Sequence, residues 1–253
     1  MYIKNQHRLD NFLVANSLVK TRQRAQELIK MQGVLVNGEV VTKKSYSVKF
    51  NDKVEIKEEI MPYVSRGGLK LAAALKEFQI NVREKVCLDI GASTGGFTDC
   101  LLQNGARLVY AVDVGENQLH ESLKNDARVK SFEKTDVRFF DLPAGQKTNE
   151  TERVDFICLD LSFISLKLIL PVLKKFLRTD GDIVALFKPQ FESGLNQVNK
   201  RGIVFNQKKI AAALEEFVVS AREEGFIKRN LCLSPILGKN GNQEYLIHLQ
   251  NKK

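Results

Sequence analysis

Apolar positions in the first part of the chain follow a helical spacing twice and then the pattern of a hairpin. The helical positions are Leu9, Phe12 and Leu13 in one segment, and Ala25, Leu28 and Ile29 in the next. Thr21 stands where the second helix needs an N-cap, because a threonine side chain can accept a hydrogen bond from the first helical turn. Residues 33–41 place Asn37-Gly38 between two apolar runs, the strongest short-range hairpin signal. We therefore expect a small α+β domain over residues 1–60.

The rest of the chain alternates continuous apolar runs with amphipathic stretches. The runs predict buried strands at 86–90, 108–113, 154–160 and 182–187, and a further strand–helix step that ends near 135–137. One amphipathic helix is expected around Lys70, and another from Phe97 onward. Strands that alternate with helices favour a doubly wound α/β fold with a mainly parallel sheet. Two acids and a proline within 58–62 mark a boundary, so we expect a linker at 61–66 and a second domain at 67–253.

Composition narrows the class of protein. Of the 253 residues, 43% are apolar and only 5 are proline, which excludes a disordered chain. The four cysteines, at positions 87, 100, 158 and 232, form no Cys-x-x-Cys pair and have no histidine pair nearby, so neither a zinc site nor a disulfide framework is expected. The first residues hold no apolar run, and the most apolar stretch, 156–173, contains charges and a proline. We expect a cytoplasmic protein without a membrane span and without a metal.

Basic residues are concentrated at the start of the chain. The formal net charge is +9, and residues 1–50 contain nine lysines and arginines against three acidic residues. Such an excess predicts a polyanionic partner. Arg22 and Arg24 lie in the first turn of the second expected helix, where the helix dipole disfavours cations, so a partner such as phosphate is one explanation. A solvated basic helix end is the other, and the charge pattern leaves both open.

Polar residues repeatedly follow the expected strands of the second domain. The segment Gly91-Ala92-Ser93-Thr94-Gly95-Gly96 joins the first strand to a helix; it lacks the dinucleotide fingerprint because Ser93 replaces the second glycine. Asp113 ends the second strand, where a carboxylate can accept both hydroxyls of a ribose. Asp136 could receive an adenine amino group, and Asp160 ends the fourth strand. Ligands bind at such carboxyl ends in open α/β sheets, although each acid alone could instead cap the helix that follows it.

The first domain resembles the S4 RNA-binding domain. The resemblance is carried by Arg8-Leu9-Asp10, by Thr21-Arg22 through Ala25 with Leu28-Ile29, and by Gly33-Val34-Leu35-Val36-Asn37-Gly38. It implies that two helices and a hairpin present a basic surface to structured RNA, mostly to its backbone and shape. The basic residues expected on this surface are Arg8, Lys20, Arg22, Arg24, Lys30, Lys43 and Lys44.

The chain as a whole resembles the TlyA family, in which an S4 domain precedes an FtsJ-like methyltransferase domain. The strings that carry the resemblance are Tyr63-Val64-Ser65-Arg66-Gly67-Gly68-Leu69-Lys70-Leu71, Asp89-Ile90-Gly91 through Asp99, Ala111-Val112-Asp113-Val114-Gly115, Leu159-Asp160-Leu161-Ser162-Phe163-Ile164-Ser165, and Phe187-Lys188-Pro189-Gln190-Phe191-Glu192. The resemblance implies a Rossmann-like class I methyltransferase that uses S-adenosylmethionine. The cofactor-binding residues it implies are Gly91, Ser93, Gly95, Gly96, Phe97, Asp113, Asp136 and Asp160.

The resemblance also implies an activity. FtsJ-like enzymes methylate ribose 2′-oxygens of RNA with a Lys-Asp-Lys-Glu set, which here would be Lys70, Asp160, Lys188 and Glu244. The family's substrates are cytidines of ribosomal RNA, so ribosomal RNA or a ribosomal subunit is the expected partner, and the short termini favour the large subunit. A sugar hydroxyl is a weak acid, so attack on a methyl group needs a base. The second cation, Lys70, together with partial burial would favour the neutral amine of Lys188.

Two other functions stay open. A ribosome-binding or assembly factor that has lost catalysis would keep the basic domain, and methyl transfer from labelled cofactor would distinguish it from an enzyme. Proteins that resemble the TlyA family have also been called haemolysins, so a membrane-active protein is a remote alternative. The sequence offers no spanning segment and no long basic amphipathic helix in its support.

Overall fold

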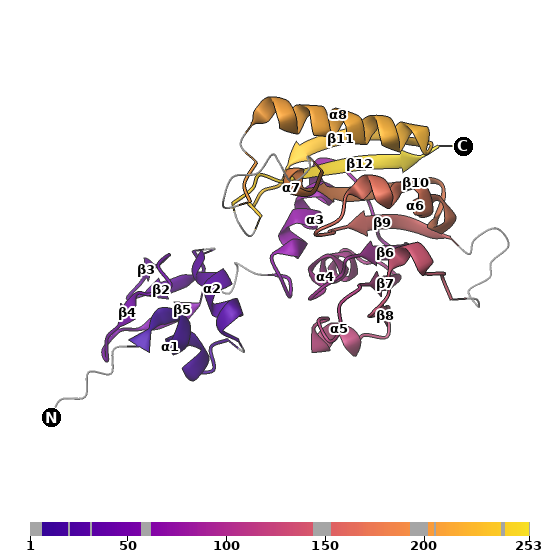
Figure 1. Cartoon of the computed structure of the whole chain (residues 1–253). Coiled ribbons are helices and arrows are strands. Elements are labelled where there is room, and N and C mark those ends of the chain that lie inside the picture. The colour runs from indigo at the N-terminus through magenta and orange to yellow at the C-terminus, as the bar shows by residue number, and fades with distance from the viewer. Residues whose placement is uncertain are drawn as a thin grey trace. The chain divides into compact units, whose positions relative to one another are not determined.

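The chain divides into two compact units. The computed structural model in Figure 1 describes residues 7–19, 21–30, 32–56, 62–143, 153–192, 202–204, 206–238 and 241–252. The units comprise Met1–Pro62 and Tyr63–Lys253. Residues 63–66, which we expected in a linker, belong to the second unit, where the Val64 N–H donates to the Asp99 carboxylate at 2.7 Å.

The first unit is the expected small α+β arrangement. Its elements are α1 (Leu9–Ala15), α2 (Arg22–Lys30), a two-stranded sheet of β1 (His7–Arg8) with β4 (Ser47–Val48), and a three-stranded sheet β3-β2-β5. The bounds of the last three strands are Glu39–Val40, Val34–Val36 and Val54–Ile56. Asn37 and Gly38 both have positive φ, as a tight hairpin turn requires. Apolar residues from both helices and from the sheets form one core, with Leu9, Leu13, Ala25 and Val34 fully buried.

The second unit is built on a seven-stranded, mostly parallel sheet, which confirms the predicted fold class. The strand order is β11-β12-β10-β9-β6-β7-β8, and only β12 runs antiparallel to its two neighbours. The strands are β6 (Val86–Ile90), β7 (Leu108–Val112), β8 (Val129–Phe132), β9 (Val154–Leu159), β10 (Leu177–Phe187), β11 (Phe226–Leu233) and β12 (Tyr245–Asn251). β10 starts earlier than predicted because Leu177 already pairs with Val154 of β9. An irregularity around Asp180, which has a positive φ, separates this pair from the regular pairing that begins at Asp182.

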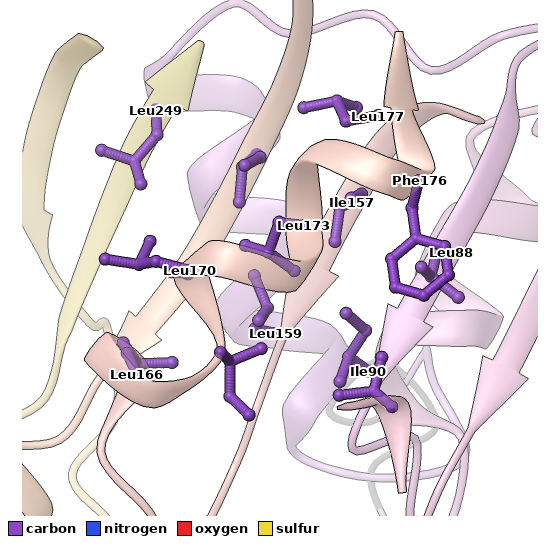
Figure 2. Packing of buried hydrophobic residues seen from close by; sticks show 14 of the residues in the cluster. Leu88, Ile90, Ile157, Leu159, Leu166, Leu170, Leu173, Phe176, Leu177 and Leu249 are labelled. Atoms are coloured by element: carbon purple, nitrogen blue, oxygen red, sulfur yellow. The ribbon is translucent and has the colours of Figure 1, made fainter. Parts of the chain in front are cut away.

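Helices cover both faces of this sheet. They are α3 (Gly67–Glu77), α4 (Gly96–Gln103), α5 (Glu121–Lys124), α6 (Leu170–Phe176), α7 (Pro189–Glu192) and α8 (Gln207–Glu223), with short 3-10 helices η2 (Val137–Phe139) and η3 (Leu166–Leu168). Successive strand residues point to opposite faces, so Ile157 and Leu159 pack beneath α6 whereas Phe156 and Cys158 pack toward α3 and α4. Figure 2 shows the first of these layers. Burial on both faces explains why these strands are continuous apolar runs.

The chain reverses its direction across the sheet between β6 and β9. It passes from β6 to β7 and β8, and then returns to the other side of β6 as β9. The segments that follow β6 and β9 therefore run from the same edge of the sheet toward opposite sides. Open α/β sheets bind ligands in the crevice between two such segments. Gly91 and Asp160 follow directly after these two strands.

Candidate active site at the carboxyl edge of the sheet

Lys188 and Asp160 form an ion pair at the ends of two neighbouring strands. Lys188 follows β10 and Asp160 follows β9, and the parallel register places Ala185 opposite Leu159. The Lys188 Nζ lies 2.6 Å from Asp160 Oδ1 and donates a hydrogen bond to Ser162 Oγ at 3.0 Å. The lysine side chain is only 10% exposed, so its amine is held by these partners rather than by bulk water.

Lys70 and Glu244 form a second pair beside the first. Glu244 directly precedes β12, whose Tyr245 lies opposite Phe187 of β10, so Glu244 and Lys188 occupy adjacent strand ends. The Lys70 Nζ from α3 lies 2.6 Å from Glu244 Oε2, and the two side chains are 10% and 3% exposed. Removing two charges from water costs several kcal/mol for each ion, so this pair is a poor means of gaining stability. The four residues implied by the resemblance are thus brought together as two ion pairs.

Glycine 91 permits the ends of β6 and β9 to approach closely. Its φ is +83°, and a Cβ there would lie 2.6 Å from the Asp160 carbonyl oxygen. The Asp160 N–H donates to the Ile90 carbonyl at 3.0 Å, so a backbone hydrogen bond joins the ends of β9 and β6. The glycine turn and the Lys188–Asp160 pair therefore share one wall of the crevice.

The next two glycines serve the packing of helix ends. A Cβ on Gly95, whose φ is +94°, would lie 2.2 Å from a Leu123 methyl group. A Cβ on Gly96 would lie 2.2 Å from Ser65 Oγ and 2.9 Å from the Gly68 nitrogen, so α4 begins against the start of α3. Phe97, which we expected at the cofactor, has its side chain in the core at 3% exposure.

Asp113 is held in place by the glycine turn. Its Oδ2 accepts the Ser93 N–H at 2.8 Å and its Oδ1 accepts the Gly115 N–H at 2.6 Å. Ser93 is at φ +48° and its hydroxyl donates to Gln118 Oε1 at 3.0 Å. Val114, directly after the acid, is 72% exposed and offers apolar surface beside the carboxylate. Gln118 carried no sequence signal, because its role depends on the loop that brings it back to Ser93.

Asp136 acts as a cap, which was the alternative explanation for such acids. It accepts the Arg138 N–H at the start of η2, and both of its oxygens bond the Arg138 guanidinium, the shorter distance being 2.6 Å. This arginine lowers the pKa of Asp136. Glu133 holds the preceding loop by accepting the N–H groups of Asn117, Gln118 and Leu119. The Glu133 role was not visible from residue type alone.

Asp89 is a buried acid that the sequence reasoning missed. It lies in β6, two residues before Gly91, and is fully buried. The Thr98 hydroxyl donates to its Oδ2 at 2.6 Å, yet burial raises the pKa of Asp89 to about 7. An acid inside an otherwise apolar strand was the signal that could have drawn attention to it.

Phe163 is the second residue that the sequence reasoning missed. It is 90% exposed, and its φ of +66° is rare for a bulky side chain and costs roughly 1–2 kcal/mol. Its ring lies 5.1 Å from that of Phe191, measured between centroids. An aromatic pair of one exposed and one half-buried ring thus stands beside Lys188, whose Nζ is 6.0 Å from the centre of the Phe191 ring.

The basic residues of the first unit are organised by one buried acid. Asp10 is fully buried, and it accepts hydrogen bonds from Arg8 Nε at 3.1 Å and Arg22 Nε at 3.0 Å. Thr21 accepts the Arg24 N–H at 3.2 Å, as an N-cap does. The remaining candidates Lys30, Lys43 and Lys44 are exposed, and Lys20 lies outside the described residues.

Among the residues that the structure describes, no group of three or more His, Cys, Asp or Glu side chains is placed to hold a metal ion. No helix in the described part of the chain is long and apolar enough to cross a membrane.

Each of the two units matches a known protein family. The family model described as FtsJ-like methyltransferase matches residues 63–251, and the S4 domain model matches residues 7–54. The 16S/23S rRNA (cytidine-2′-O)-methyltransferase TlyA of Mycobacterium tuberculosis is 40% identical over 97% of this chain and 90% of its own length. The 23S rRNA (cytidine-2′-O)-methyltransferase TlyA of Campylobacter jejuni is 36% identical over 94% and 97%. A solved structure from Streptococcus thermophilus, named as a hemolysin candidate, is 42% identical and superposes with a TM-score of 0.75 over 98% of this chain and 89% of that one.

Proposed function

Because the chain belongs to the FtsJ-like methyltransferase family and, with an S4 domain in front, to the TlyA group, we propose that it methylates a cytidine 2′-oxygen of ribosomal RNA. The observation that carries this proposal is the pairing of Lys188 with Asp160 and of Lys70 with Glu244 at adjacent strand ends. The methyl donor we propose is S-adenosylmethionine. The names of the two TlyA relatives supply the nucleotide, the oxygen and the class of RNA.

The residues that follow β6, β7 and β9 support a cofactor of this kind at the crevice beside β6. When bound, S-adenosylmethionine supplies an electrophilic methyl group on a sulfonium. Asp113 keeps acceptor sites for two ribose hydroxyls beyond the two backbone N–H groups it already holds, and the exposed Val114 gives an apolar surface for the base. Gly91 has no Cβ, so the glycine turn lies directly against the Asp160 backbone at this point. The Asp136 carboxylate is engaged by Arg138, so an adenine amino group would use one of its remaining acceptor sites.

The remaining residues position and deprotonate the sugar hydroxyl. A 2′-hydroxyl must lose its proton as its oxygen attacks, and Lys188 is our candidate for the amine that receives it. Asp160 and Ser162 fix the position of the Lys188 Nζ. The buried Lys70–Glu244 pair lines the same edge and orients the ribose. Holding the attacking oxygen in line with the methyl group supplies a large part of the acceleration, because the reactants lose their translational and rotational freedom on binding, before the chemical step.

The first unit supplies affinity for the RNA. Asp10 holds Arg8 and Arg22 in a defined geometry before any phosphate arrives, which reduces the ordering that binding requires. Base edges are hidden in the deep major groove of A-form RNA, so recognition through backbone and shape suits this surface. We infer that the large subunit is the substrate, and the relative that modifies both subunits makes the choice an experimental question.

Methyl transfer from labelled cofactor tests the proposal. Purified large and small subunits and protein-free ribosomal RNA are offered separately, and we expect label in large-subunit RNA. Lys188→Ala should bind cofactor and RNA normally and transfer nothing, whereas Asp113→Ala should weaken cofactor binding itself. Full activity of Lys188→Ala would overturn the catalytic assignment. Failure of the unaltered protein to label any of the three RNAs, while it binds them, would favour the non-catalytic ribosome-binding function.

The hemolysin name of one relative calls for a separate control. Protein freed of nucleic acid is incubated with dye-loaded liposomes of neutral and of anionic lipids. We expect no dye release, because no helix in the described residues is long and apolar enough to span a bilayer. Prompt release by both the unaltered protein and Lys188→Ala would establish a membrane activity independent of methyl transfer.

A further inference from the structure

The segments that follow the neighbouring strands β9 and β10 contact each other through a series of side chains. One segment follows β9 and runs from Asp160 to Leu166, and the other follows β10 and comprises Lys188 and α7. The contacts between them are Lys188 with Asp160, Lys188 with Ser162, Phe191 with Phe163, and Glu192 with Ser165 and Leu166. The first contact belongs to the proposed catalytic set, whereas the last lies at the opposite end of the loop.

Glu192 makes two short hydrogen bonds from a buried position. Its residue is 9% exposed, and burial raises the pKa of its carboxyl group. Its Oε2 accepts the Ser165 hydroxyl at 2.5 Å, and its Oε1 accepts the Leu166 N–H at 2.7 Å. Ser165 caps η3 and Leu166 begins it, with Leu166 buried in the core. Glu192 therefore fixes the point at which the loop enters the folded body.

The loop between these anchors needs an external restraint. Phe163 holds a left-handed backbone conformation with its ring 90% exposed, so burial of the ring does not compensate for the backbone strain. Such conformations persist only where the surrounding structure enforces them. Lys188 restrains one end of the loop through Asp160 and Ser162, and Glu192 restrains the other through Ser165 and Leu166.

We propose that Glu192 is a positioning residue that keeps Asp160 and Ser162 in register with the Lys188 amine. This inference rests on the proposed function, because the geometry it protects is that of the catalytic pair. Among the residues that the structure describes, the Glu192 carboxylate bonds Ser165 and Leu166 of this loop, and it acts through them. Displacement of a positioned group by about 1 Å can cost roughly a hundredfold in rate, so release of the loop should appear in turnover.

The test compares Glu192→Ala with Glu192→Gln and with a matched control. Glutamine keeps an oxygen for the Leu166 N–H and an amide group for the Ser165 hydroxyl, so it should retain most of the activity. The control is Glu216→Ala, which removes a carboxylate that bonds Lys167 in the same region but is 65% exposed and, within the described part of the chain, forms no hydrogen bond to the loop backbone. For Glu192→Ala we expect kcat to fall at least about tenfold, while the Kd for S-adenosylmethionine changes less than about twofold. Glu216→Ala should match the unaltered protein in both.

Hydrogen exchange supplies a readout that does not depend on activity. Peptides that cover residues 160–168 should exchange faster in Glu192→Ala than in Glu192→Gln, while peptides from β6 and β7 stay unchanged. Unchanged exchange in this loop, or unchanged kcat in Glu192→Ala, would overturn the inference. An equal loss of cofactor affinity and of kcat would also overturn it, because that pattern indicates general loss of structure. If the unaltered protein transfers no methyl group, the proposed function fails, and the exchange result alone decides whether Glu192 tethers the loop.

Discussion

Replacement of Asp10 by asparagine tests how the first unit holds its arginines. The carboxylate is fully buried and accepts hydrogen bonds from Arg8, Arg22 and Gln26. Burial opposes its ionisation, yet the bonds from Arg8, Arg22 and Gln26 outweigh burial and lower the pKa of Asp10 from 3.8 to about 2. Asparagine has nearly the same shape but cannot pair with a guanidinium, so the variant removes the charge interaction with little change in packing.

The expected loss follows from linkage between protonation and folding. A pKa lowered from 3.8 to about 2 corresponds to roughly 2.4 kcal/mol, at about 1.36 kcal/mol for each tenfold change in acidity. The two arginine side chains are 44% and 54% exposed, so solvent screening reduces this to roughly 1–2 kcal/mol. The folded pKa is the lower one, so the stabilisation is complete above pH 3.8 and disappears as the pH falls through about 2.

Hydrogen exchange with mass spectrometry in graded urea measures this loss within the intact protein. The chain has no tryptophan, whereas peptides from α1 and α2 report on the first unit alone. At pH 7 we expect Asp10→Asn to lower the free energy of unfolding of that unit by roughly 1–2 kcal/mol. Glu55→Gln is the control, because Glu55 forms an exposed pair with Lys53 worth at most about 1 kcal/mol. Equal stability of Asp10→Asn and the unaltered protein at pH 7 would refute the reasoning.

Three further predictions concern the second unit and the affinity for RNA. Gly96→Ala should destabilise the second unit by roughly 1–3 kcal/mol in urea unfolding, because its Cβ would press on backbone atoms of α3; unaltered stability would show that the helices can separate freely. Glu244→Ala should cost about 3–5 kcal/mol because it leaves the buried Lys70 ammonium unpaired, and adding Lys70→Met should restore stability but not methyl transfer. In the double variant Arg22→Ala and Arg24→Ala, the slope of log RNA affinity against log salt concentration should become less steep by about 0.7–0.9 for each phosphate contact that is lost. An identical slope would mean that both arginines are ordinary surface charges.

The elements with strong local signals were predictable from the sequence. The Asn37–Gly38 turn and the strands β6, β7 and β9 lie where the apolar runs and turn residues placed them. These signals are local, because a doubly buried strand must be continuously apolar and a tight hairpin must accept positive φ. β11 was not predicted, since it lies at the edge of the sheet and its side chains are mostly exposed.

The arrangement of the site depended on information that no local pattern contains. Lys70 and Glu244 are separated by most of the second unit, and only the antiparallel insertion of β12 beside β10 brings them together. Residue type alone also did not settle the partners of two side chains. Asp136 caps η2 and pairs with Arg138, and the Phe97 side chain packs in the core. Only the folded chain shows these partners.

The contact between the starts of α3 and α4 has a consequence for how this protein can change over evolutionary time. A Cβ on Gly68 would collide with the Tyr63 ring, and one on Gly96 would collide with Ser65 and with the backbone of Gly68. The space at each of these two glycines is therefore taken up by neighbouring atoms, so a larger residue there requires the neighbours to move. A larger residue at 96 becomes acceptable only after α3 has shifted, and that shift would carry Lys70 with it. Substitutions in the glycine turn and in the helix that bears Lys70 should consequently show epistasis, so the two motifs are constrained to diverge together.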